Sequence, residues 1–498
     1  MNKLKFEYVP LSFINDQEEI KKQIRNTVIL IHLFEKYNSP VRLEKLIEGT
    51  QYGYNASALQ SGKNKFLRIS DIHESKVNWE TVPFCNCDDE ETYLLKNEDI
   101  LIARTGGTTG KSFKIDFAPE HAIYAGYLIR IRAKETVNPD YIYLFLHSFA
   151  YWSQIVNLNE RNFRPKANAE NLKSLVLPNC DKNIQDEAVL LAKGEQLKGY
   201  EELNAKIKKA LAEYEKSQKI QSLLTDQLNQ IENLNQAILQ EAVQGKLVPQ
   251  DPNDEPANEL LKRIKAEKEK SGKKEKPLPT IKPEEIPFEI PESWVWCRLG
   301  EICDIKGGKR VANGYRLLKT PTNHIYIRVT DMKNGTISSD NLQYIDEKMF
   351  EQIKQYTISK NDLYITIAGT IGQVGIVPEL FDNMNLTENA AKFVFNNSLI
   401  NKGWIKEILC SKNSQNQFLD KTKKVTAQPK LALTRIATTL IALPPIPEQK
   451  RIIAEIENQL AKTIQLKEHI ISNQQATEQL LKALLHEAFV VEETVTVE

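Results

Sequence analysis

The stretch ARTGGTTGKSF (residues 103–113) has the residue types of a phosphate-binding loop, with glycines followed by Gly-Lys-Ser. A P-loop also needs a glycine at a fixed distance before the Gly-Lys-Ser, because the turn that points N–H groups at the phosphates closes over that length. Thr105 occupies this position, and Gly106 and Gly107 come one and two residues too late. The spacing therefore argues against ATP binding and leaves a glycine-threonine loop with another purpose.

No cysteine or histidine pattern in the chain predicts a metal site or a disulfide framework. The six cysteines lack the paired spacing of such sites: Cys85, Cys87, Cys180, Cys297, Cys303 and Cys410. Scattered free thiols fit a reducing cytosol. We therefore expect a cytoplasmic protein with no metal and no cofactor.

The sequence also lacks the patterns of enzymes that act on DNA. A DNA methyltransferase needs an Asn/Asp-Pro-Pro-aromatic loop, whereas the only Pro-Pro here follows leucine in LPPIPEQ (residues 443–449). A nuclease needs carboxylates and a lysine around Mg²⁺, and the nearest string, AEKEK (residues 266–270), lies in a polar stretch. No Ser-His-Asp or Cys-His pattern is visible. We expect no catalytic residue in this chain.

Length and charge limit the possible classes of protein. A chain of 498 residues is long enough for two or more domains, each with its own core. The 66 Lys and Arg residues balance 66 Asp and Glu residues, so any surface for nucleic acid must be local. The first residues, MNKLKFEYVP, lack the apolar region of a secretory signal, and no apolar run approaches the roughly 18 residues of a membrane span. We expect a soluble protein with no membrane partner.

Several segments of the first half return in the same order about 260 residues later. FLRISDI (residues 66–72) returns as YIRVTDM (residues 326–332), and both alternate as a half-buried strand does. KNEDILIARTGG (residues 96–107) returns as KNDLYITIAGT (residues 360–370). The glycine-threonine loop therefore has a copy, in which Gln373 stands at the position of Lys111, so the lysine that a nucleotide site requires is not repeated.

Weaker pairs mark the ends of each repeated unit. VRLEKLI (residues 41–47) and CRLGEIC (residues 297–303) open the units. RPKANAENLKSLVLP (residues 164–178) and QPKLALTRIATTLIALP (residues 428–444) close them with a hydrophobic strand that runs into proline. The chain is therefore predicted to be an internal duplication.

A helical composition, rich in Glu, Lys, Gln, Ala and Leu, follows each unit. After the first unit, apolar residues recur mostly at three- and four-residue steps, as in a coiled-coil seam: Tyr200, Leu203, Ile207, Leu211, Tyr214, Ile220, Leu224, Leu228, Ile231, Leu234 and Ile238. After the second unit the same steps connect Ile453, Ile456, Leu460, Ile464 and Ile471. A homodimer zipper or plain core would give the same stripe, but the duplication favours pairing of the two helices within the chain.

These observations predict an α+β protein with two similar globular domains, of mixed strands and helices, joined by a long antiparallel helix pair. The predicted order is an N-terminal helical segment (1–39), a first domain (40–180), a central long helix (181–250), a linker with a short helix (251–289), a second domain (290–446) and a C-terminal long helix (447–498). We expect the linker, which includes QDPNDEP and SGKKEKPLPTIKPEEIP, to be exposed.

The order of elements resembles the specificity subunit of type I restriction-modification systems. The matching motifs are GTQYGYNAS (residues 49–57), ILQEAVQGKLVPQDPNDEPANELL (238–261), PESWVWCRLGEI (291–302) and LPPIPEQKRI (443–452). The resemblance implies a non-catalytic subunit whose two target-recognition domains bind double-stranded DNA. It also implies partners: two methyltransferase subunits and, in the restricting complex, two restriction subunits that translocate DNA.

Two unequal readers on a spacer should bind two different half-sites. Base edges are read by Arg, Asn, Gln, Ser and Thr, and phosphates are bound by Lys, Arg, hydroxyls and glycine-loop N–H groups. The candidate DNA-binding residues of the first domain are Tyr54, Arg68, Ser70, Arg104, Thr105, Gly106, Thr108, Thr109, Lys111, Arg161, Arg164 and Lys166. Those of the second domain are Lys309, Arg310, Tyr315, Arg328, Thr330, Thr366, Gly369, Thr370, Gln373, Lys423, Lys424, Gln428 and Lys430.

Several of these residues have structural alternatives. Arg68 and Asp71, like Arg328 and Asp331, could form an internal ion pair at a strand end. The glycine loops could be hairpin turns without a ligand. KTKK (residues 421–424) could be a solvated face, and the tyrosines of QYGYN could be hairpin aromatics. A purely structural coiled-coil adaptor would explain the helices but not the duplicated strand-rich units.

Overall fold

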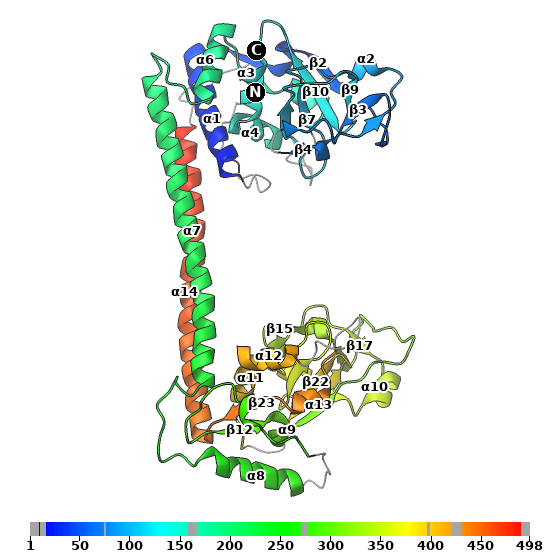
Figure 1. The fold of residues 1–498 in the computed structure, drawn as a ribbon, viewed down its shortest axis with the longest axis vertical. Helices are drawn as coiled ribbons and strands as arrows, with labels where there is room; N and C mark the ends of the chain where they lie inside the picture. The colour runs from blue at the N-terminus through cyan, green and yellow to red at the C-terminus, as the bar shows by residue number, and fades with distance from the viewer. Residues whose placement is uncertain are drawn as a thin grey trace. The chain divides into compact units, whose positions relative to one another are not determined.

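The computed structural model describes residues 9, 16–73, 76–157, 167–270, 277–395, 399–420 and 430–489 (Figure 1). The chain divides into two compact units. Unit 1 comprises Met1–Leu224 and Ile471–Glu498, and unit 2 comprises Thr225–Ile470. Each unit contains strands and helices around hydrophobic cores of its own.

Unit 1 is built on a four-stranded antiparallel sheet. Its strand order is β2 (Ile47–Tyr52), β10 (Leu128–Ala133), β7 (Ile100–Ala103) and β8 (Ser112–Lys114). A second sheet has the order β6 (Phe84–Cys85), β3 (Asn64–Leu67) and β9 (Ala122–Tyr124), with β3 parallel to β9. Two short pairs complete the unit: β1 (Pro40–Arg42) with β11 (Val176–Pro178), and β4 (Ile72–His73) with β5 (Lys76–Val77).

Helices surround the sheets of unit 1. They are α1 (Gln17–Tyr37), α2 (Glu90–Tyr93), α3 (Pro139–Leu146), α4 (Phe149–Asn157), α5 (Ala169–Lys173) and α6 (Lys182–Ala192), with the 3-10 turns η1 (Leu43–Lys45) and η2 (Ile69–Asp71). Helix α1 begins because the Asp16 side chain accepts a hydrogen bond from the Glu18 N–H, and it ends at the left-handed Asn38. Its apolar face, with Ile24 and Phe34, is buried in the core of the unit.

Unit 2 repeats this topology and adds one strand, β18, to its second sheet. Its four-stranded sheet has the order β13 (Asp304–Gly307), β22 (Ala390–Val394), β19 (Leu363–Thr366) and β20 (Val374–Ile376). The second sheet has the order β17 (Tyr344–Ile345), β14 (His324–Ile327), β21 (Met384–Leu386) and β18 (Thr357–Ile358), with β14 parallel to β21. The short pairs are β12 (Val295–Arg298) with β23 (Leu440–Leu443), and β15 (Met332–Lys333) with β16 (Thr336–Ile337). The repeat predicted from the sequence is therefore a repeat of the fold.

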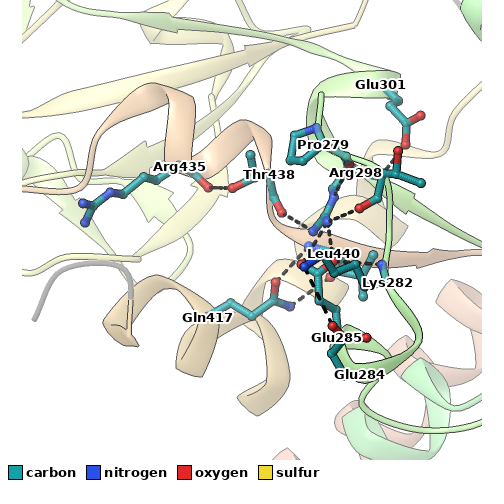
Figure 2. Close-up of polar contacts among 11 residues, drawn as sticks. Pro279, Lys282, Glu284, Glu285, Arg298, Glu301, Gln417, Arg435, Thr438 and Leu440 are labelled. Carbon is teal, nitrogen blue, oxygen red and sulfur yellow. Dashed lines mark hydrogen bonds and ion pairs between the residues drawn. The ribbon is translucent and has the colours of Figure 1, made fainter. Parts of the chain in front are cut away.

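The helices of unit 2 are α8 (Ala257–Lys270), α9 (Leu299–Ile302), α10 (Glu347–Ile353), α11 (Lys402–Cys410), α12 (Lys412–Asp420) and α13 (Leu433–Ala437), with the turns η3 (Pro283–Glu285), η4 (Val329–Asp331) and η5 (Glu379–Phe381). Equivalent glutamines join helix to strand in both units. In unit 1 the Gln154 amide exchanges two hydrogen bonds of 2.8 Å with the backbone of Val176. In unit 2 the Gln417 amide does the same with Leu440, at 2.9 and 2.8 Å (Figure 2).

Helices α7 (Glu201–Val243) and α14 (Ile446–Ala488) each contribute residues to both units. In unit 1, Leu203 and Ile207 of α7 share a core with Leu485 of α14, and the Gln221 amide donates a 2.8 Å hydrogen bond to the Gln474 carbonyl. In unit 2, Ile238 near the end of α7 shares a core with Ile456 near the start of α14. The beginning of each helix therefore meets the end of the other, which is the predicted antiparallel pairing.

Four residues predicted for the seam face solvent instead. Ile220 is 36% exposed, Leu234 47%, Ile464 57% and Ile471 39%, whereas neighbours such as Leu224 and Ile470 are buried. A two-helix contact covers only a narrow stripe of each helix, so part of a broad apolar face stays outside it.

Within the segment expected to be an exposed linker, helix α8 instead packs on unit 2, whereas residues 250–256 and 277–287 on either side of it are mostly exposed. Ala257, Leu260 and Ile264 of α8 are fully or almost fully buried. The side chains of Leu260 and Ile264 belong to the core of the unit. The spacing of three and four residues places them on one helix face. This apolar face was overlooked in the sequence because charged residues surround it.

A buried arginine ties the rest of that segment to unit 2. Arg298, at the end of β12, is 4% exposed and forms hydrogen bonds of 2.9 and 2.7 Å with both carboxylate oxygens of Glu285. It also donates to the Pro279 carbonyl at 3.3 Å and to the Thr438 carbonyl at 3.0 Å (Figure 2). Because one guanidinium bonds two separate chain segments, it fixes residues 279–285 against the strand pair β12–β23.

Candidate nucleic-acid interface

The two glycine-threonine loops are hairpin connections of the same kind. Residues 104–111 connect β7 to β8, where Ile102 pairs with Ser112, and residues 367–373 connect β19 to β20, where Ile365 pairs with Val374. In each loop two glycines have left-handed backbones: Gly106 at φ +88° and Gly110 at +86°, and Gly369 at +77° and Gly372 at +91°. Both loops are therefore hairpin connections, and their contact with DNA stays a prediction.

Each loop is held on a helix of its own unit. The Tyr151 hydroxyl of α4 donates a 2.7 Å hydrogen bond to the Gly110 carbonyl. In unit 2 the Gln415 amide of α12 donates a 2.9 Å hydrogen bond to the Gly372 carbonyl. A Cβ atom added to Gly110 would lie 2.8 Å from the Trp152 ring, so only glycine allows this approach. In the loop of unit 1 the base is fixed by these contacts, and residues 104–107 at the tip are exposed.

Two further turns of unit 1 lie beside the hairpin loop. The Arg104 N–H donates a 2.9 Å hydrogen bond to the Tyr127 carbonyl, and the Gly53 N–H donates a 3.1 Å hydrogen bond to the Leu128 carbonyl. Residues 53–55, 126–127 and 104–111 therefore meet at one end of the four-stranded sheet. We call these three loops the loop edge of unit 1.

Unit 2 has an equivalent loop edge, formed by residues 308–310, 388–389 and 367–373. The Ile367 N–H donates a 2.8 Å hydrogen bond to the Asn389 carbonyl, and the Gly308 N–H donates a 3.1 Å hydrogen bond to the Ala390 carbonyl. These bonds match those of Arg104 and Gly53 one for one. Equivalent backbone positions of the two units can therefore be paired, and their side chains can be compared.

At the loop edge of unit 1, Arg104 lies over the Tyr52 ring, with the guanidinium carbon 4.9 Å from the ring centroid. The Tyr52 hydroxyl accepts a 3.1 Å hydrogen bond from the Ala169 N–H at the start of α5. Burial raises the pKa of Tyr127, and the nearby Arg68 guanidinium opposes this shift. Two predicted residues, Arg68 and Arg104, thus lie near Tyr127, and Arg104 brings a positive charge to this edge, whereas Asp71 balances the charge of Arg68.

The Arg-Asp motif forms the same internal ion pair in both units. In unit 1 the Arg68 side chain donates hydrogen bonds of 3.0 and 2.7 Å to Asp71. In unit 2 the distances from Arg328 to Asp331 are 3.1 and 2.6 Å. The scaffolding alternative is therefore realised, because each carboxylate also accepts the backbone N–H of its arginine at 2.8 Å and so shapes the turn after the strand. The exposed hydroxyl residues Ser70 and Thr330 lie inside these turns.

At the loop edge of unit 2 the basic residues gather around a carboxylate. Arg310 Nε donates a 2.6 Å hydrogen bond to Glu388 Oε1, and Lys430 Nζ donates a 3.0 Å bond to the Glu388 carbonyl. Burial alone would raise the pKa of Glu388, but the hydrogen bonds from Arg310 and Thr387 outweigh burial and lower that pKa. Lys309 Nζ lies 5.7 Å from the centroid of the Tyr356 ring.

Several predicted residues serve the local structure. The Thr109 hydroxyl donates a 2.7 Å hydrogen bond to the Gly106 carbonyl, and the buried Thr366 hydroxyl donates to the Thr370 carbonyl. Tyr54 packs on Tyr93, with ring centroids 5.3 Å apart.

Tyr315 packs against the cluster that contains Tyr326. Its hydroxyl accepts a 2.9 Å hydrogen bond from the Asp346 N–H, at the start of α10. The remaining predicted loop residues, Thr105, Thr108, Lys111 and Gln373, lie in the hairpin loops themselves. Six predicted residues lie outside the described residues: Arg161, Arg164, Lys166, Lys423, Lys424 and Gln428.

Sequence reasoning missed three residues of the loop edges. Tyr127 and Glu388 occupy the turns that precede β10 and β22, and Asn55 follows the predicted Tyr54. Their neighbours at the edge are far away in the sequence, so no local pattern points to them. Within the described ranges, no group of three or more His, Cys, Asp or Glu residues is arranged to hold a metal ion. None of the helices described is both long and apolar enough to cross a membrane.

Comparison with known proteins finds sequence relatives of the chain. Residues 291–474 match the family model described as "Type I restriction modification DNA specificity domain". The chain is 34% identical over 270 residues to the type I restriction enzyme EcoAI specificity subunit of Escherichia coli, which covers 52% of this chain and 44% of that protein. It is 32% identical over 283 residues to the EcoEI specificity subunit of Escherichia coli, covering 54% and 46%. The match thus spans less than half of the length of these two relatives.

A solved structure shares the fold. It is described as "Structural basis underlying complex assembly and conformational transition of the type I R-M system", and its chain superposes with a TM-score of 0.53 at 16% identity. The match covers 90% of this chain and 97% of that chain. The family model and the curated relatives identify type I restriction-modification specificity subunits as the proteins that this chain resembles in sequence, and the solved structure shares its fold.

Proposed function

We propose that this chain is the DNA-recognition subunit of a type I restriction-modification complex and that it has no catalytic activity of its own. Each unit binds one half of an asymmetric, two-part site on double-stranded DNA, with its loop edge directed into the major groove. The observation that carries this proposal is the loop edge itself, which has the same backbone hydrogen bonds in both units but different side chains. A repeated backbone with unequal side chains suits two half-sites of unequal sequence.

The chemistry of the two edges supports binding to DNA. Exposed loop tips with left-handed glycines let backbone N–H groups approach a phosphate closely. Arg104 at one edge and Lys430 at the other supply positive charge beside these tips. The chain as a whole has a formal net charge of zero, so affinity must arise from such local groups.

We propose that the chain recruits its partners through its helices. Two methyltransferase subunits, and in the restricting complex two restriction subunits, would supply the chemistry in the cytoplasm. Exposed apolar side chains on α7 and α14 support a docking role, among them Leu223 at 54%, Ile464 at 57% and Leu480 at 59%. Such side chains on a polar helix surface are typical of protein interfaces.

We also propose that the paired helices set the gap between the two half-sites. This proposal rests on the continuity of α7 and α14, each of which runs without a break from one compact unit into the other. A helix rises about 1.5 Å per residue and is therefore a suitable spacer element.

The proposed function is tested by selection from a pool of randomised duplexes with the full chain and its methyltransferase subunits. We expect enrichment of a motif with two short, different half-sites at a constant spacing. As a second readout, replacing both Arg104 and Lys111 by alanine should weaken binding to all duplexes and reduce the salt dependence. The absence of any enriched sequence would contradict the proposal.

A further inference from the structure

One exposed position of the loop edge carries a different polar side chain in each unit. The Tyr54 N–H donates a 2.8 Å hydrogen bond to the Tyr124 carbonyl, and the Lys309 N–H donates a 2.8 Å hydrogen bond to the Leu386 carbonyl. The next residue is Asn55 in unit 1 and Arg310 in unit 2. Asn55 and Arg310 are therefore structural equivalents, and both are exposed.

The residue that each of them covers also differs between the units. The turns of residues 125–128 and 387–390 match, because Ala125 and Thr387 donate to equivalent carbonyls of Leu67 and Ile327, at 2.9 and 3.1 Å. The second residue of the turn is Gly126 in unit 1 and Glu388 in unit 2.

The exposed side chains of Asn55 and Arg310 each match the residue of the adjacent turn, Gly126 or Glu388. A Cβ atom added to Gly126 would collide with the Asn55 amide oxygen, so the amide occupies the space that a side chain at 126 would fill. In unit 2 the corresponding side chain is present, and Glu388 accepts a 2.6 Å hydrogen bond from Arg310. The pairs Asn55–Gly126 and Arg310–Glu388 are thus alternative solutions at one position.

The Arg310 side chain has the geometry of a prepared fork. Its side chain is 74% exposed, and Glu388 is bound through Nε alone. Among the described residues no hydrogen bond holds its two terminal nitrogens. A guanidinium anchored at Nε presents both terminal N–H groups in one plane, which matches the O6 and N7 acceptors of guanine.

A phosphate contact fits this pair less well than a base contact. The Glu388 carboxylate neutralises the Arg310 charge and would itself repel a phosphate group. A base edge, in contrast, offers neutral acceptors to the guanidinium. The Asn55 amide supplies one donor and one acceptor, the pattern that pairs with N7 and the N6 amino group of adenine.

We propose that this position reads a base in each half-site: Arg310, positioned by Glu388, selects guanine through unit 2, and Asn55 selects adenine through unit 1. The inference rests on the proposed function and deepens it. Glu388 acts through Arg310 and is a positioning residue. The two half-sites therefore differ at this position because Arg with Glu has replaced Asn with Gly.

The test uses the full chain with its methyltransferase subunits and selects bound duplexes from a randomised pool. Arg310→Ala should lower the preference for guanine at one position of one half-site by roughly 5- to 150-fold and leave the other positions unchanged. Asn55→Ala should relax one adenine in the other half-site. Glu388→Gln should weaken the same guanine preference as Arg310→Ala, with the melting temperature close to that of the wild type.

A matched control is Lys360→Ala, which removes an exposed ion pair with Glu379. Lys360 precedes β19 and so lies at the opposite end of that strand from the loop. This variant should keep the wild-type preferences at every position. Unchanged base preferences in Arg310→Ala, or an equal loss for all sequences as expected of a phosphate contact, would overturn the inference while the proposed function stands. If the wild type enriched no motif at all, the proposed function would fail as well.

Discussion

At the scale of single residues, the loop edges depend on glycines that no other residue replaces freely. Gly110 has a φ of +86° and contacts the Trp152 ring, whereas Gly107 in the same loop has open space around it and no left-handed backbone. Substitutions at Gly110 and Gly107 therefore separate two effects on stability: that of the loop's backbone conformation and that of losing a glycine.

Gly110→Ala should therefore destabilise unit 1 by about 2–3 kcal/mol, because the alanine is strained at positive φ and its methyl group overlaps Trp152. Gly107→Ala should change stability by less than about 0.5 kcal/mol. Thermal unfolding of both variants, followed by DNA binding, measures the difference. Equal melting temperatures for the two variants would show that the loop does not need the conformation described here.

A second residue-scale prediction concerns the dependence of stability on pH. Burial raises the pKa of Glu448, near the start of α14, above its ordinary value. A carboxyl group with a raised pKa stabilises the folded state below its unfolded pKa, and this contribution is lost as the pH rises through the folded pKa. Glu448→Gln should thus gain stability relative to the wild type as the pH rises from about 4 to 7.

Glu455 on the same helix is the matched control, since hydrogen bonds from Gln459 and Asn458 lower its pKa. Glu455→Gln should show the opposite trend, losing stability relative to the wild type over the same range. Melting temperatures at several pH values measure both trends. A constant difference between Glu448→Gln and the wild type would contradict the assignment of the raised pKa.

At the scale of secondary-structure elements, the two units differ in how their first strand is covered. Arg298 ends β12 in a buried network with Glu285, whereas Arg42, at the equivalent end of β1, has a side chain that is 59% exposed. Unit 2 therefore uses this arginine to bind residues 279–285, and unit 1 has no such dependence on Arg42.

Arg298→Ala should destabilise unit 2 by about 3 kcal/mol, because the carbonyls of Pro279 and Thr438 and the Glu285 carboxylate lose their donor. Arg42→Ala should stay within about 0.5 kcal/mol of the wild type. Hydrogen exchange should also show faster exchange in residues 279–285 of Arg298→Ala only. Similar effects of the two substitutions would contradict the claim that Arg298 holds residues 279–285 against unit 2.

The same scale shows what the sequence could and could not predict. The repeated strands were found because alternation and order survive in FLRISDI and YIRVTDM, and these segments form β3 with η2 and β14 with η4. Helix α8 was expected to be exposed because Ala257, Leu260 and Ile264 are hidden among charges. The pairing of Arg310 with Glu388 could not be predicted, because the two residues are 78 positions apart in the sequence. Only the folded chain brings the turn that contains Glu388 next to Arg310.

At the scale of the whole molecule, the proposed ruler predicts a change in the recognised gap. Insertion of about four residues, one helical turn, into both α7 and α14 at the boundary between the units should lengthen the preferred gap by about one to two base pairs. Selection from duplexes with variable gaps measures this change. The half-site sequences should stay the same, and an unchanged gap would rule out the helices as the spacer.

The six-segment division of the chain and the individual DNA contacts remain predictions, whereas the repeated fold and the match of residues 291–474 to the family model are observations. The central claim is that two unlike readers act as one recognition subunit. The measurement that tests it most directly is a map of methylated bases in a host genome that carries this chain and its methyltransferase subunits. We expect methylation within one asymmetric motif of two different half-sites and a fixed gap of unspecified bases. A single uninterrupted or palindromic motif would contradict the account.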